Sequence, residues 1–158
     1  MRSVSVPPTR APVPSLYAAD RRRELVDRLA RLEATQLPRW GRFTAPQMLA
    51  HLLEAMRMAS GELEVPRRPF PLRPLMRLLF IHVLPMPKGA PTSPAMLARQ
   101  PDSWEKDVAS LRATIEAVRE PAAGATLPEH PIFGRMSARD WGVLMYKHID
   151  HHFRQFAI

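Results

Sequence analysis

The chain has 158 residues, of which 46% are hydrophobic, and a formal net charge of +8. This length and apolar content suit one globular domain with a core of its own. The absence of cysteine excludes disulfides, thiolate metal ligands and a cysteine nucleophile. No segment approaches the roughly 20 apolar residues that a membrane-spanning helix needs, so we expect no membrane partner.

The N-terminal residues 1–15 contain four prolines and no apolar periodicity. We therefore expect a flexible tail here, followed by a single domain over residues 16–158. The tail lacks the apolar stretch of a secretory signal, which predicts a cytoplasmic location. The arginines are scattered along the chain without interleaved aromatic residues, so we expect no nucleic-acid partner.

Four segments have the 3.6-residue apolar periodicity of amphipathic helices. The second has Thr44 as N-cap and Pro46 in its first turn, and the fourth opens on a capping-box-like pair, Ser137 and Asp140. The predicted helices run from residue 20 towards Pro38, from 44 to 61, from 103 to 120, and from 137 to the last residues.

A long connection separates the second and third of these helices. Residues 66–101 hold nine of the 18 prolines, which predicts an irregular crossover around one short apolar helix over residues 75–83. Leu75, Leu78, Leu79 and Phe80 are too apolar for a free loop, so we expect them to pack across the other helices or in a homodimer. With no alternating apolar run, the sequence predicts an all-α fold of four antiparallel helices with one long proline-rich crossover.

Three of the six histidines lie within residues 146–156. A rotation of 100° per residue places five residues of the last helix on one inward stripe: Trp141, Met145, His148, His152 and Gln155. His151 lies at the edge of this stripe. On the second helix the same rotation places Met48 and His51 on one face, which makes His51 a candidate third inward imidazole.

Two histidines at positions i and i+4 offer nitrogens to one divalent ion, and a third from a facing helix leaves further positions for water or substrate. Zinc suits three imidazoles best, with nickel next. The same spacing also occurs where core histidines are hydrogen-bonded to carbonyl groups, so both interpretations stay open here. Met48, Met58, Met145 and Trp141 would wall a pocket beside such a site, although methionines at this spacing also suit a plain core.

The segments "WGRFTAPQMLAHLLEA" (40–55) and "EHPIFGRMSARDWGVLMYKHIDHHFRQF" (129–156) resemble the DinB/YfiT-like superfamily. Within it they resemble a subfamily of uncharacterised DinB-like proteins with W-G-x-x-T-x-x-Q-M-x-x-H and Y-K-H-x-D-H-H-x-R-Q-F motifs. The resemblance covers about 45 residues. It implies an up-down-down-up four-helix bundle that binds a divalent metal through His51, His148 and His152, with Gln155 supporting them.

That superfamily includes thiol-dependent transferases and isomerases, so the resemblance implies a metal-dependent thiol transferase whose partners are a small thiol and an electrophile. A hydrolase in which the ion activates water would use the same residues. A non-catalytic metal-stabilised bundle or a small-ligand-binding module is the third hypothesis. Three roles stay open for His151: it could support a ligand histidine, shuttle a proton or simply be exposed at the surface. We expect His130 to be structural, and His82 has no assigned role.

Overall fold

The computed structural model describes residues 13–68 and 71–158. Over these residues the chain forms helices and no strand, and an isolated bridge joins His130 to Gly134. The all-α prediction is therefore confirmed. None of the described helices combines the length and the apolar character that a bilayer crossing requires. Most of the predicted tail lies outside the described residues, and Val13 packs against a cluster of buried side chains.

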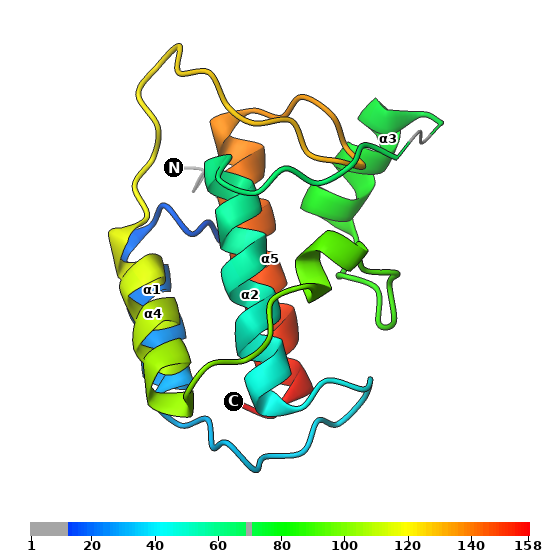
Figure 1. Ribbon diagram of the computed structural model, residues 1–158. Coiled ribbons are helices and arrows are strands. Elements are labelled where there is room, and N and C mark those ends of the chain that lie inside the picture. Colours follow the sequence, from blue (N-terminus) through cyan, green and yellow to red (C-terminus); the bar gives the residue numbers. More distant parts are fainter. Residues whose placement is uncertain (1–12, 69–70) are drawn as a thin grey trace, which may run out of the picture.

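The four long helices are α1 (Ala19–Leu29), α2 (Ala45–Ser60), α4 (Trp104–Ala117) and α5 (Ala138–Gln155). Helices α2 and α5 contact each other, and both contact the α1–α4 side of the molecule. Figure 1 shows α1 and α4 on one side of the α2–α5 pair and the crossover on the other side. One flank of this pair therefore meets helices, and the opposite flank meets an irregular chain.

The two helices that carry the candidate ligands start and end where the sequence predicts. The Thr44 side chain accepts a hydrogen bond from the Gln47 backbone, and Gln47 returns one to Thr44, so α2 begins with a capping box. It ends at Gly61, which has a left-handed backbone with φ 85°. Ser137 and Asp140 form the same reciprocal cap on α5. These caps set the start of each helix and therefore the phase of its histidines.

Helix α1 is shorter than predicted. It ends at Leu29, because the backbone tightens into turn-like bonds from Arg31 to Arg28 and from Leu32 to Leu29. Leu32 is still buried, but it reaches the core from outside the helix. Helix α4 likewise ends at Ala117, before the predicted boundary.

The crossover contains α3 (Arg73–Arg77), a π-helical turn η1 (Leu78–Val83) and a 3₁₀ turn η2 (Pro94–Leu97). Lys147 of α5 holds η1 in place by donating to the carbonyl oxygens of Phe80, Ile81 and Leu84 at 2.7, 3.1 and 2.6 Å. The expected packing of the crossover is correct only in part. Of the four named residues, Leu79 and Phe80 are partly buried, whereas Leu75 and Leu78 are exposed. The fully buried residue of this segment is Ile81, because η1 turns only one side towards α5.

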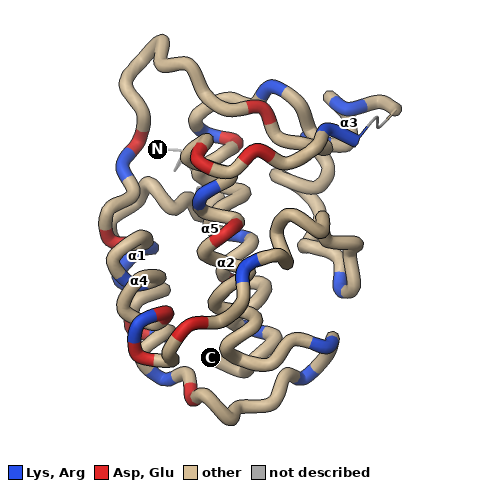
Figure 2. Tube along the Cα trace, in the orientation of Figure 1, with Lys and Arg blue, Asp and Glu red and all other residues tan. Residues whose placement is uncertain are grey.

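Figure 2 shows lysine and arginine positions spread over helices and connections alike. Several are paired locally, as where Arg28 bridges Glu24 of its own helix and Asp150 of α5. Basic residues thus contribute to contacts within the fold as well as to its net charge.

Candidate metal centre

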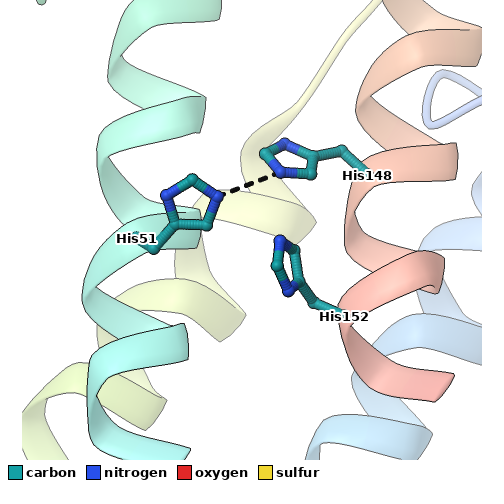
Figure 3. A group of neighbouring side chains, drawn as sticks. All are labelled: His51, His148 and His152. Carbon is teal, nitrogen blue, oxygen red and sulfur yellow. Dashed lines mark hydrogen bonds between the residues drawn. The ribbon is translucent and has the colours of Figure 1, made fainter. Parts of the chain in front are cut away.

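Three imidazoles from two helices point at one another between α2 and α5 (Figure 3). His51 comes from α2, and His148 and His152 come from successive turns of α5. Each offers one ring nitrogen, and these three nitrogens lie within 4.8 Å of one another. His51 is 4% exposed and His152 is 7% exposed, while His148 is partly exposed. The structure thus brings together the three histidines that the helical phase singles out.

Hydrogen bonds fix which nitrogen of His152 faces the centre. The Gln155 amide nitrogen donates to the Trp40 carbonyl at 2.7 Å, so the amide oxygen must face the other way. That oxygen accepts from Nδ1 of His152 at 2.8 Å. Because Nδ1 carries the proton, Nε2 has a free lone pair directed at the centre.

His51 is oriented in a similar way by the crossover. Its Nδ1 lies 3.4 Å from the carbonyl oxygen of Met96 in η2, which makes Nδ1 the donor and leaves Nε2 as the acceptor. This Nε2 lies 3.1 Å from Nε2 of His148. Two nitrogens bound to one tetrahedral zinc ion at the usual bond lengths would be about 3.3 Å apart. The donor set and the spacing of this pair therefore suit a single metal ion.

Burial keeps these imidazoles neutral. Desolvation lowers the pKa of His51, and it lowers the pKa of His152 to about 3, with the neighbouring His51 adding to the shift. The pKa of His148 falls well below its ordinary value, first through desolvation and then through its histidine neighbours. A metal ligand must be unprotonated, so these shifts favour metal binding at neutral pH.

The connection before α2 supports the histidines through residues that the sequence interpretation did not assign. The Phe43 ring stacks on His51, with centroids 5.2 Å apart, and also contacts His152. Gly41 has φ 81°, and a Cβ atom built there would lie 2.5 Å from the Gln155 amide nitrogen. Glycine is therefore required at this position both by the backbone and by the approach of Gln155. The Trp-Gly pair of the first motif was the sequence feature that could have indicated a role for this connection.

A cavity of about 380 Å³ reaches all three histidines. It extends between the C-terminal half of α2, α5 and the crossover, and its lining is mainly apolar. Met58, Trp141 and Met145 line it, as the sequence predicts. Arg68 is the one permanently charged side chain among the described residues of the lining, and it is exposed at the surface.

Three other predicted residues lie outside the cavity lining. Met48 is fully buried in the core instead, because the cavity extends from His51 towards the C-terminal end of α2 and Met48 lies on the other side of that histidine. Gln155 is buried behind His152. His151 is half-buried against the Trp40 ring, at a centroid distance of 5.8 Å.

Residues 17–158 match the family model described as "Protein of unknown function (DUF1569)". The chain belongs to this family. The assignment to the DinB/YfiT-like superfamily was wrong: it rested on about 45 residues in two motifs, whereas the matching model covers nearly the whole chain. No match was found among the curated proteins or among the solved structures.

Proposed function

We propose that this DUF1569 protein binds one divalent ion, preferably zinc, through His51, His148 and His152, and uses it to activate a small thiol for attack on an electrophile. The observation that carries this proposal is the cavity of about 380 Å³ that opens onto all three histidines. A purely structural ion needs a closed coordination shell, whereas a catalytic one needs room for an exchangeable ligand.

The residues of the chain have separable roles in this proposal. His51, His148 and His152 supply neutral nitrogens, and Gln155 and the Met96 carbonyl hold two of the rings by their Nδ1 atoms. The apolar lining excludes water from the ligand. When bound, the ion supplies a positive charge that lowers the pKa of a thiol or of water at its open position.

Two features favour a small thiol as one substrate. The chain has no cysteine, so in a thiol-dependent reaction the sulfur nucleophile would come from an external thiol. Arg68 stands at the lining as a cation suited to a carboxylate of that thiol. The methionines and aromatic rings around the cavity suit an electrophile with an apolar body.

A metal-dependent hydrolase is the second candidate. Three neutral imidazoles leave the full charge of the ion uncompensated, which is the donor set that suits activation of water at neutral pH. Both reactions would use the same histidines, and they differ only in the nucleophile.

For the fold, we propose the up-down-down-up arrangement of four helices, without the superfamily assignment. Its support is that α2 contacts both α4 and α5, and that α1 contacts α4 and α5. This order would run α2 and α5 in opposite directions and keep both ligand-bearing helices adjacent. An experimental structure would test it.

Cobalt substitution tests the function directly. Cobalt(II) replaces zinc in imidazole sites and absorbs visible light, and a thiolate bound to it adds a charge-transfer band. We expect that band when 2-mercaptoethanol is added, and zinc-dependent conjugation of the thiol with 1-chloro-2,4-dinitrobenzene. A change in the cobalt spectrum with hydroxide but not with thiol would favour the hydrolase, and an unresponsive spectrum would favour a non-catalytic ion.

A further inference from the structure

His130 is held rigidly in the loop before α5. Its backbone exchanges two hydrogen bonds with Gly134, at 2.9 and 2.8 Å. Its ring stacks on Phe133 with centroids 4.7 Å apart and an interplanar angle of 24°. The Trp141 ring lies 5.6 Å from it. These contacts leave the imidazole little freedom to turn.

The same loop decides which ring nitrogen carries the proton. The backbone N–H groups of Ile132 and Phe133 both lie 3.2 Å from Nδ1 of His130, so Nδ1 accepts and is unprotonated. A neutral imidazole then carries its proton on Nε2. Burial lowers the pKa of His130 to about 4, which keeps the ring in this neutral form near neutral pH.

The Nε2–H group of His130 has no hydrogen-bond partner among the described residues, and it is accessible to solvent. His130 lines the same cavity as the three ligand histidines. It is also close enough to His148 for a charge on one to lower the pKa of the other. A ligand that displaced water from this mainly apolar cavity would leave the donor unpaired unless it carried an acceptor, and an unpaired buried donor is costly.

We propose that His130 is a substrate-binding residue whose Nε2–H donates a hydrogen bond to an oxygen acceptor, such as a carbonyl, on a small molecule with an apolar body. This inference rests on the proposed function only in taking the cavity as the substrate site. It assigns the cavity a ligand class, a small apolar molecule with an oxygen acceptor, that the three histidines alone do not specify.

Nitrogen-15 NMR on the unaltered chain tests the tautomer. Long-range correlations from the ring carbons should show a bare Nδ1 and a protonated Nε2 for His130 at pH 7. Because no substitution is involved, this result does not depend on whether a variant folds. A proton on Nδ1 would overturn the inference.

Two probes of nearly equal shape test the donor. Acetophenone carries a carbonyl where α-methylstyrene carries a CH₂ group, so only acetophenone can accept from His130. With metal-free protein we expect acetophenone to bind about fivefold more tightly, the factor typical of one net hydrogen bond, and to shift the Nε2–H resonance of His130. His130→Phe should abolish the preference, and His151→Gln, outside the cavity lining, should keep it.

Equal binding of the two probes, or no binding of either, would overturn the inference. Zinc affinity measured on the same samples separates it from the proposed function. His130→Phe should bind zinc as the unaltered chain does, and a chain that binds no zinc but prefers acetophenone would contradict the metal proposal alone.

Discussion

The two flanks of the α2–α5 pair differ in how tightly their side chains pack. Towards α1 and α4 the side chains close into a core, with Leu25, Leu49, Leu111 and Phe153 all fully buried. Towards the crossover the buried cluster is smaller, and methionines and prolines surround a cavity. Two helices thus serve both flanks: one flank supplies stability, and the other leaves room for a ligand beside the histidines.

Substitutions in the core on the α1–α4 side should lower the free energy of unfolding more than substitutions on the cavity side. Phe153→Ala removes a fully buried ring from the closed core and should lower the free energy of unfolding by about 3–5 kcal/mol. Phe133→Ala, which removes a partly buried ring on the cavity side, should lower it by less than half as much. Urea unfolding measures both. Equal losses would mean that the two flanks do not differ in stability.

Gly41→Ala should weaken zinc binding on the cavity side without removing any side chain from the core. The added Cβ would meet the Gln155 amide, displace it from His152, and lower the zinc affinity about tenfold. Gly89→Ala is a matched control, since Gly89 has a similar φ of 74° but nothing within 4 Å of the added atom. Both variants share the backbone strain, so competition with a chelating dye should show a zinc defect in Gly41→Ala alone.

The free energy of unfolding of the metal-free protein should depend on pH, because buried histidines on the cavity side titrate at lower pH in the folded chain than in the unfolded chain. Burial lowers the pKa of His130 to about 4 and of His152 to about 3. Between these values and about pH 6.5 the two histidines are therefore protonated in the unfolded chain but neutral in the folded one. Their contribution to stability is complete only well above pH 6.5, the ordinary pKa of histidine, and is lost as the pH falls from there towards those values. From pH 7 to 6 the loss should be about 1.4 kcal/mol for the two together.

Urea unfolding with chelator present measures this loss together with the contributions of His51 and His148, and His130→Gln should reduce the total by about 0.7 kcal/mol. A free energy of unfolding that stays constant or rises as the pH falls from 7 to 6 would show that these imidazoles are not kept neutral by the fold.

The smallest effect should come from the exposed side of the crossover. Leu78 is 53% exposed, so Leu78→Ser should change the free energy of unfolding by less than about 0.5 kcal/mol. Sedimentation of the unaltered chain at several concentrations would show whether a homodimer covers this leucine. A monomer strongly destabilised by Leu78→Ser would contradict its exposure in the structure.

The predictable part of the site is the part that local geometry controls. Capping residues and the rotation of 100° per residue were enough to align His51, His148 and His152, because all three lie within regular helices. Residues that reach the site from irregular chain escaped prediction. Phe43 and Met96 contact His51 from connections whose course no periodicity describes, and His130 became a donor only through the turn that presents two N–H groups to its Nδ1.

The short helix predicted over residues 75–83 is present in part, but the π-helical form of η1 was not predicted, since Lys147 holds that turn from a different helix. Met48 shows the complementary error. It shares the helical face of His51, but a shared face does not tell on which side of the histidine the cavity lies.

Zinc titration of the unaltered chain and its single histidine variants, without an affinity tag, tests the central claim most directly. We expect one zinc per chain, and His51→Ala, His148→Ala and His152→Ala should each lose most of the occupancy because a nitrogen ligand is removed. His151→Ala should keep it, since that ring packs against Trp40. A chain that binds no zinc, or a site emptied by His151→Ala but not by His148→Ala, would contradict this account of the centre.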